Sequence, residues 1–406
     1  MSSSWRVSLG ALAVVLIVVL PYAARAERDT WVATWGASPQ DAELDALRVS
    51  GATLRQFVRI SVGGSKARIR LSNLYGTEPV VVGATHLAVR GEGNRIIPST
   101  DRAVTFRGQR AVTLAAGGQA LSDEVDLALR DLADVAISLY LPGDVALRTE
   151  HTFALATSLV SGPGDFAART EFTPARTATA VSLATDLEVA AAKGSRAVVV
   201  LGDSVPDGIG STMDGHERWP DHLARRLLAD RRLPRTAVIN QGIAGNRVLH
   251  DWIGPSALAR LDRDVLAKPG VRHVIVAHGL NDFGIPAAFD RPAEEVAAAD
   301  VIEGLQQIIA RGRAAGLKVY GGTLKPMEGT RRRGYYSSAS EAKRQAVNRW
   351  IRTSRAFDAV IDFDVVLRDP ERPTRLLPAY DSGDGSHPND RGYKAMADAI
   401  DLALFR

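Results

Sequence analysis

The second half of the sequence alternates between short apolar segments and longer stretches of helical periodicity. The apolar segments have no regular polar alternation, so both faces of each strand are expected to be buried. Strands are predicted at residues 197–201, 237–239, 273–277, 319–324 and 359–362, and helices at about 219–233, 257–267, 293–315, 340–355 and 390–404. This α/β pattern predicts a parallel sheet of five strands that helices cover on both sides. Ligands of such sheets bind beyond the carboxyl ends of the strands.

The first half has a different pattern. Residues 31–182 contain short alternating segments punctuated by Gly, Pro, Asn and Asp, without long helical periodicity. Residues 57–62 and 67–71 alternate around Gly63-Gly64-Ser65, which predicts a β-hairpin. Further strands are expected at residues 80–89, 103–106, 111–114 and 135–141. The region is therefore predicted to form a β-sandwich.

The N-terminus has the layout of a secretory signal peptide. Arg6 precedes an apolar run at residues 9–20, and Ala24-Arg25-Ala26 offers a small-residue cleavage site. A retained membrane anchor is the alternative, although the run is shorter than the roughly 20 residues of a spanning helix. We expect a secreted or periplasmic protein with no stable membrane insertion after cleavage.

These patterns divide the 406 residues into four segments, which agrees with a two-domain length. They are a signal peptide at residues 1–26, a β-rich accessory domain at 27–182, a linker at 183–195 and an α/β domain at 196–406. The boundary rests on a stretch rich in Ala and Thr that ends at Lys193-Gly194-Ser195.

Composition excludes several kinds of chemistry. The sequence has no cysteine, which leaves no disulfide, no cysteine nucleophile, no lipid attachment to cysteine and no cysteine-based zinc site. The formal net charge of +4 falls to +2 when Arg6 and Arg25 leave with the signal peptide. Such a balance predicts no nucleic-acid partner. The run Arg331-Arg332-Arg333 is interpreted as a solvated loop.

Four short motifs occur in order in the second half, and the first three follow predicted strands. They are Gly202-Asp203-Ser204, Gly245-Asn246, Gly279-Leu280-Asn281-Asp282 and Asp384-Gly385-Ser386-His387-Pro388. The last motif comes just before the final predicted helix. Because the carboxyl ends of parallel strands meet at one edge of the sheet, the four motifs are expected to converge there.

The first and last motifs contain the residue types of nucleophilic catalysis. A hydroxyl is a poor nucleophile unless a base removes its proton, so Ser204 needs a partner. His387 is the candidate base, and Asp384 can orient its imidazole and stabilise its cation. His278, at the end of another strand, is the competing candidate. The plainer alternatives are a serine that only caps a turn and a surface Asp/His pair.

The two middle motifs can supply donors for a tetrahedral oxyanion. Gly245 lets a backbone N–H approach a substrate, and Asn281 offers a side-chain amide. Together with the N–H of Ser204 they form a predicted oxyanion hole of three donors. Both residue types are also common in turns, which is the alternative interpretation.

Taken together and in this order, the four motifs resemble those of the SGNH/GDSL hydrolases, named for this Ser, Gly, Asn and His. The resemblance covers roughly residues 194–404. It implies an α/β/α sandwich, a triad of Ser204, His387 and Asp384, an oxyanion hole with Gly245 and Asn281, and no metal or cofactor. Some secreted relatives carry an N-terminal β-domain. The residues after Ser204 depart from the apolar-Thr-Asp-Gly of many relatives.

Three functions are weighed on this basis. The leading one is a secreted serine esterase for short-chain esters or O-acetylated carbohydrates, acting on a small-molecule or polysaccharide substrate; a lipase for longer acyl chains is its close alternative. The second is a carbohydrate-binding protein with a degenerate hydrolase core. The third is a metal-dependent phosphoesterase with Asp203, Asp282, Asp384 and His387 as ligands.

Overall fold

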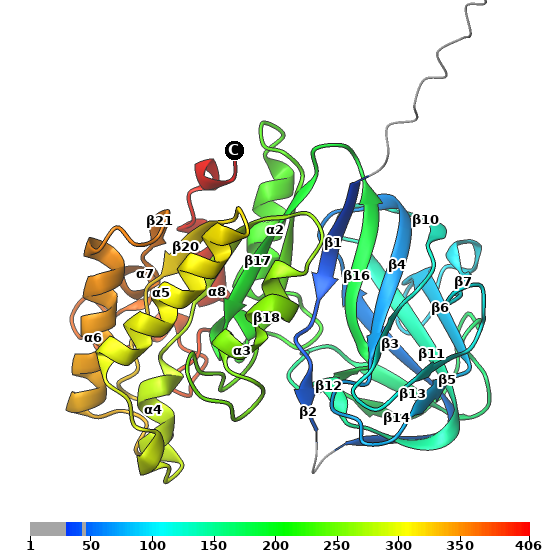
Figure 1. The fold of residues 1–406 in the computed structure, drawn as a ribbon, viewed down its shortest axis with the longest axis horizontal. Coiled ribbons are helices and arrows are strands. Elements are labelled where there is room, and N and C mark those ends of the chain that lie inside the picture. The colour runs from blue at the N-terminus through cyan, green and yellow to red at the C-terminus, as the bar shows by residue number, and fades with distance from the viewer. Residues whose placement is uncertain (1–29, 43–45) are drawn as a thin grey trace, which may run out of the picture.

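The computed structural model describes residues 30–42 and 46–406, which form a β-sandwich joined to an α/β region (Figure 1). The predicted signal peptide, residues 1–26, lies outside the described residues. Every helix within the described ranges is too short or too polar to cross a bilayer.

The α/β region contains the predicted five-stranded parallel sheet. Its order is β18 (Thr236–Gly242), β17 (Arg196–Gly202), β19 (Val271–Ala277), β20 (Lys318–Gly322) and β21 (Ala359–Ile361). All neighbouring pairs are parallel. The chain starts at β17, adds β18 on one side and then β19 on the other, so the direction of winding reverses at β17. In open α/β sheets this switch point is where ligands bind.

Helices cover both faces of this sheet. On one face, Val198 and Val200 pack against α2 (Trp219–Ala229), α7 (Phe363–Leu367) and α8 (Asp390–Asp398). On the other, Val199 and Leu201 belong to the cluster that includes α3 (Ala257–Leu261), the π-helical turn η2 (Asp262–Leu266), α4 (Asn281–Ala288), α5 (Ala298–Ala314) and α6 (Ser338–Thr353). Alternate residues of the central strands β17 and β19 thus enter different cores, as expected for strands buried on both faces.

The helices differ from the sequence prediction in several places. The predicted helix at residues 257–267 is divided between α3 and η2. Helix α4 was not expected, because Pro286 inside it removes a backbone donor and normally argues against a helix. The remaining short helices are α1 (Ser204–Asp207), η1 (Pro98–Thr100), η3 (Pro292–Glu294), η4 (Pro378–Tyr380) and η5 (Leu402–Phe405).

The N-terminal region is mostly β-strand, arranged chiefly in two antiparallel sheets. The first contains β1 (Thr30–Gly36), β16 (Ala184–Ala191), β4 (Gly64–Ser72) and β10 (Val125–Leu129), with β9 (Gln119–Leu121) also paired to β4. The second contains β14 (Pro174–Ala178), β13 (Ser158–Pro163), β3 (Leu47–Arg59), β11 (Asp134–Leu147), β6 (Ala84–Val89) and β7 (Arg102–Val104). Smaller pairings join β2 (Gln40–Asp41), β12 (Thr149–His151) and β15 (Val181–Ser182), and β5 (Val80–Val82) with β8 (Val112–Leu114).

The predicted hairpin around Gly63-Gly64-Ser65 is wrong. Strand β3 pairs with β11 and β13, whereas β4 pairs with β16, β10 and β9 in the other sheet. The two glycines therefore carry the chain from one sheet of the sandwich to the other. A Cβ on Gly63 would lie 2.0 Å from the Leu129 carbonyl oxygen, so the crossing needs a residue without a side chain.

The predicted linker at residues 183–195 is also wrong. Most of it is strand β16, which is buried along its whole length and pairs with both β1 and β4. Its apolar and small residues fill the sandwich core, and their composition alone resembles that of a linker. Only residues 192–195 separate β16 from β17, the first strand of the parallel sheet.

The two regions are packed tightly together. Ser61 Oγ donates to the Val238 carbonyl oxygen at 2.7 Å and accepts from Val238 N at 3.1 Å, which gives edge strand β18 partners on its open side. Ala33 N donates to the Pro269 carbonyl oxygen at 3.0 Å. One hydrophobic cluster runs from the sandwich into the parallel sheet. Figure 1 shows β1 and β16 lying beside the α/β region.

Candidate active site

Ser204 lies directly beyond the carboxyl end of β17, as the first residue of the short helix α1. Asp203 caps this helix, because its side chain accepts from Val205 N at 3.0 Å. The turn leaves no space for a side chain at Gly202, where a Cβ would lie 2.5 Å from Pro206 Cγ and 2.6 Å from the Ala277 carbonyl oxygen. Local sequence therefore holds Ser204 at a tight strand-to-helix turn.

His387 and Asp384 meet Ser204 from the loop before α8. His387 Nε2 lies 2.9 Å from Ser204 Oγ, and His387 Nδ1 lies 2.6 Å from Asp384 Oδ2. The other carboxylate oxygen accepts the backbone N–H groups of Ser386 and His387, each at 2.7 Å. With Nδ1–H donating to Asp384, Nε2 is free to accept the serine proton.

The Asp384 carboxyl stays ionised in this arrangement. Burial alone raises its pKa, but the hydrogen bond and charge of His387 outweigh burial and hold the pKa well below its usual range. An ionised carboxylate against Nδ1 stabilises the imidazolium that forms when His387 takes a proton.

His278, the competing base, is placed elsewhere. It is 1% exposed, and its Nε2 lies 3.0 Å from Asn246 Oδ1. Burial lowers the pKa of His278 well below the ordinary value. The structure therefore brings His387, and not His278, to Ser204.

Gly245 lies in the loop after β18 and has φ of +75°, a conformation that favours glycine. A Cβ there would lie 2.9 Å from Ile253 Cδ1, so the position is also closed to side chains. Among the described residues, neither Gly245 N nor Ser204 N has an acceptor. Both residues line one cavity, which leaves two backbone donors available to a bound substrate.

Asn281 begins α4 and lines the same cavity. Its Oδ1 accepts from the Tyr335 hydroxyl at 2.6 Å, and its Nδ2 donates to the Asn246 carbonyl oxygen at 3.0 Å. These two bonds determine the amide orientation and leave the second N–H of Nδ2 for a ligand. No local pattern indicates this role of Tyr335, since Tyr335 lies 54 residues further along the chain than Asn281.

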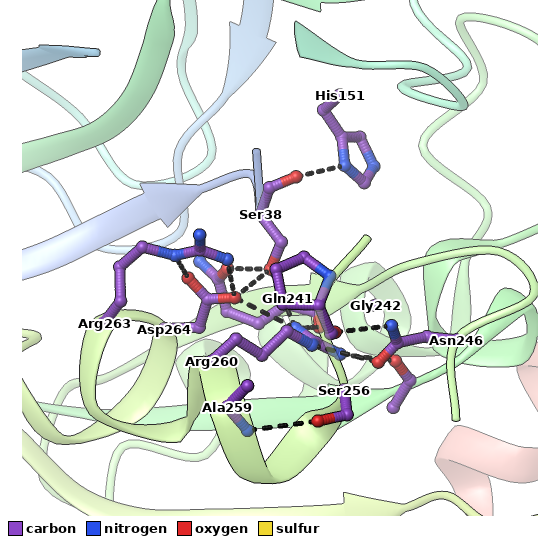
Figure 2. A network of polar contacts seen from close by, with 12 residues as sticks. Ser38, His151, Gln241, Gly242, Asn246, Ser256, Ala259, Arg260, Arg263 and Asp264 are labelled. Carbon is purple, nitrogen blue, oxygen red and sulfur yellow. Dashed lines mark hydrogen bonds and ion pairs between the residues drawn. The ribbon is translucent and has the colours of Figure 1, made fainter. Parts of the chain in front are cut away.

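A buried arginine joins the strand ends beneath these groups (Figure 2). Arg260 is 1% exposed and donates to the carbonyl oxygens of Gly202 at 2.9 Å and Gln241 at 2.7 Å. Its Nε donates to Asn246 Oδ1 at 3.0 Å. Sequence reasoning missed Arg260, because an arginine in a predicted surface helix normally reaches solvent.

The four residues weighed as metal ligands do not gather. The Asp282 carboxylate accepts Val248 N at 2.8 Å and Leu249 N at 3.1 Å, so it holds a loop rather than facing Asp384. Burial raises the pKa of Asp282 to about 7. Across the described part of the chain, no three His, Asp or Glu side chains are placed to hold a metal ion together. The placement of these side chains therefore does not favour the phosphoesterase alternative.

The cavity around Ser204 has a volume of about 700 Å³. This lies in the usual range for small-molecule sites. One wall is apolar, with Trp252 and Phe289 in edge-to-face contact at 4.3 Å between ring centroids. Phe153, from the β-sandwich, also lines the cavity and is 40% exposed. Tyr335 also lines the cavity although it is largely buried, whereas the buried Phe283 does not line it.

Another part of the wall is basic. The arginines at 331–333 are exposed, as predicted for a solvated loop, yet all three line the cavity. The guanidinium of Arg332 lies 4.5 Å from the centre of the Phe289 ring. Lys325 is buried beside the triad, with Nζ 3.4 Å from Ser386 Oγ, and burial lowers its pKa to about 8.

Comparison with solved structures finds chains of low identity that match about half of this chain. An aryl esterase of M. smegmatis is 16% identical with a TM-score of 0.42, and the match covers 52% of this chain and all of that one. A carbohydrate acetylesterase family member from Sinorhizobium meliloti is 17% identical with a TM-score of 0.41, covering 52% and 97%. A lipase/acylhydrolase from Enterococcus faecalis is 25% identical with a TM-score of 0.39, covering 50% and 93%.

Comparison with curated proteins finds no matching sequence. Residues 200–395 match the model of the GDSL-like lipase/acylhydrolase family. The matched residues run from the end of β17 into α8 and include Ser204, Gly245, Asn281, Asp384 and His387. Through this region, the chain belongs to the GDSL-like lipase/acylhydrolase family of ester hydrolases.

Proposed function

We propose that this protein is an exported serine esterase that hydrolyses carboxylic esters with short acyl groups, or O-acetyl groups on carbohydrates, through an acyl-enzyme on Ser204. The observation that carries the proposal is the unbroken chain of contacts from Ser204 Oγ through His387 to Asp384, at 2.9 and 2.6 Å. Export rests on the signal-like sequence at residues 1–26.

In the first step, His387 Nε2 takes the Ser204 proton as Oγ attacks the ester carbonyl. The resulting oxyanion accepts from Ser204 N, Gly245 N and the free N–H of Asn281. The tetrahedral intermediate collapses, and His387 returns its proton to the departing alcohol. In the second step, His387 deprotonates a water molecule, which attacks the acyl-enzyme, and the acid leaves while Ser204 regains its proton.

The cavity supports a substrate of modest size. Its apolar wall at Trp252 and Phe289 gives a sugar ring or an acyl chain aromatic surface to contact. A profile of activity against acyl length separates an esterase for short chains from the lipase alternative, because only the latter gains from each added methylene group.

The test measures hydrolysis of p-nitrophenyl esters from acetate to palmitate by the purified protein, with and without EDTA. We expect activity that is highest with short chains, unaffected by EDTA and reduced by about 10⁴-fold or more in Ser204→Ala. Ser211→Ala is the matched control, because the Ser211 hydroxyl donates to the Gly208 carbonyl oxygen at 2.8 Å and Ser211 does not line the cavity. Activity that survives in Ser204→Ala, or that EDTA removes, would contradict the proposal.

A further inference from the structure

One buried histidine of the β-sandwich lies next to the candidate active site. His151, at the end of β12, is 6% exposed. Its Nδ1 lies 2.9 Å from the Ser38 carbonyl oxygen, the contact drawn in Figure 2, and its Nε2 lies 2.9 Å from Asp207 Oδ1. Since Nδ1 faces a carbonyl and Nε2 a carboxylate, both ring nitrogens have acceptors opposite them, which is the environment of an imidazolium.

Asp207 connects this histidine to both backbone donors of the predicted oxyanion hole. It is the last residue of α1, the helix that begins at Ser204. Its second oxygen, Oδ2, accepts from Ala244 N at 2.8 Å, and Ala244 immediately precedes Gly245. One carboxylate therefore joins the helix that carries the nucleophile to the loop that carries Gly245.

The junction is buried and closely packed. Asp207 is 1% exposed, and a Cβ on Gly242 would lie 2.4 Å from Asp207 N. Burial lowers the pKa of His151, but the Asp207 carboxylate outweighs burial and raises it above the ordinary value. A buried carboxylate that loses such a partner must find another donor or move, because an unpaired charge in the interior is costly.

We propose that His151 is a positioning residue for the oxyanion hole, which makes the β-sandwich part of the active site. His151 holds Asp207, and Asp207 holds the N–H of the Ile243–Ala244 peptide, which keeps the adjoining Gly245 N facing the cavity. The active-site loop is thus kept in place by a side chain that never touches substrate. The part of this inference that concerns the catalytic rate rests on the proposed esterase function.

The chain offers a matched control in the same region. His86, in β6, is 8% exposed, and its Nδ1 lies 3.0 Å from an oxygen of Asp101. His86 belongs to the six-stranded sheet and its partner Asp101 is partly exposed; among the described residues, neither lines the cavity. Replacing either histidine should therefore lower the stability of the sandwich, whereas only replacing His151 should disturb the geometry of the oxyanion hole.

The experiment compares His151→Ala, His151→Gln and His86→Ala in the purified protein. For His151→Ala we expect kcat on p-nitrophenyl acetate to fall by about 10- to 100-fold, somewhat less than the loss of a whole donor. KM should change by less than about threefold, since the ground state makes little use of the oxyanion hole. His151→Gln keeps a donor near the Nε2 position and should restore at least part of kcat, while His86→Ala should leave kcat unchanged.

Hydrogen exchange followed by mass spectrometry gives a readout that needs no activity. In His151→Ala, the Ala244 N–H should exchange faster than in the wild type, by about tenfold or more. In His86→Ala, it should exchange at the wild-type rate. Unchanged exchange at residues 243–246, or a kcat within twofold of the wild type, would overturn the inference, as would a glutamine variant no better than alanine. If the wild type hydrolyses no ester, the proposed function fails, and exchange at Ala244 alone decides whether His151 holds the loop.

Discussion

The α/β region and the β-sandwich contribute to the site in different ways. The α/β region supplies the candidate catalytic groups, from loops and helix N-termini beyond the sheet. The sandwich supplies Ser38 and His151, which are buried and form hydrogen bonds to other protein groups. It also supplies Phe153, which lines the cavity. The candidate catalytic groups thus come from one region, whereas the groups that hold them in place come from both, since Arg260 and Tyr335 belong to the α/β region. Substitutions in the two regions are therefore expected to have different effects.

The largest effect is expected at Arg260, where the two regions meet. Arg260→Met removes donors from two carbonyl oxygens, Asn246 and Asp264 in a fully buried site. We expect the free energy of unfolding to fall by about 3–5 kcal/mol, because buried acceptors and a buried carboxylate lose their partner. Urea unfolding measures this loss, and a change below about 1 kcal/mol would show that the junction does not depend on Arg260.

Asn281→Ala should change activity rather than stability. We expect kcat to fall by about 10²–10³-fold, the usual result of losing one oxyanion donor. Asn348→Ala is a matched control, because this buried amide bonds to the backbone of Leu324 and does not line the cavity. An equal loss of kcat in both variants would assign Asn281 a structural role only.

Lys325→Met should stabilise the protein in a pH-dependent way. Burial lowers the pKa of Lys325 to about 8, so the fold disfavours its charged form. The unfolded chain holds this proton more tightly, and the stability of the wild type therefore rises as pH increases from about 8 to about 10.5. At pH 7 the variant should be more stable by about 1–3 kcal/mol, and the gap should close above pH 10.

Thermal and urea unfolding between pH 6 and 10.5 measure this effect. Lys318→Met is the control, since the Lys318 side chain is 66% exposed and its replacement should leave the pH profile unchanged. A constant difference between Lys325→Met and the wild type at all pH values would contradict the prediction.

Phe153→Ala tests whether the sandwich also affects substrate choice. Phe153 presents a partly exposed ring to the cavity, so its loss should change kcat/KM for longer acyl esters by about two- to tenfold. The rate with acetate should stay nearly constant. Phe166→Ala, at a sandwich ring that packs on Phe172 away from the cavity, should alter neither.

The smallest effect is expected at the basic wall. Replacing the arginines at 331–333 by glutamine should lower kcat/KM for 4-acetoxybenzoate about two- to fivefold at low salt, while the rate with its methyl ester stays unchanged. Added 1 M NaCl should remove the difference, because exposed charges are then screened within about 3 Å. The same loss for both esters would indicate a change of shape instead of charge.

Local patterns predicted much of the α/β region. The five parallel strands were visible as apolar runs, and Asp384 and His387 are three residues apart, so one short loop presents both. The positions of Ser204, Gly245 and Asn281 followed from the rule that loops beyond parallel strands converge. The catalytic roles of these residues stay predictions until the variants are measured.

The sequence predictions were wrong where strand pairing or burial depended on residues far away in the chain. Alternation at residues 57–62 and 67–71 showed two strands, but not that each pairs in a different sheet. The small residues of β16 resembled a linker, because composition does not show that both neighbouring strands bury them.

The sequence by itself determined the class of the α/β fold and the set of groups that meet beyond the sheet. Hydrophobic periodicity and turn residues determine local structure within a few positions, so the sequence alone shows them. Only the tertiary structure decided that Tyr335 orients Asn281, that Arg260 joins the strand ends and that His151 reaches Asp207 from the sandwich. These partners lie 54 to 58 residues apart, and a hydrogen bond over that distance depends on the packing of the whole molecule.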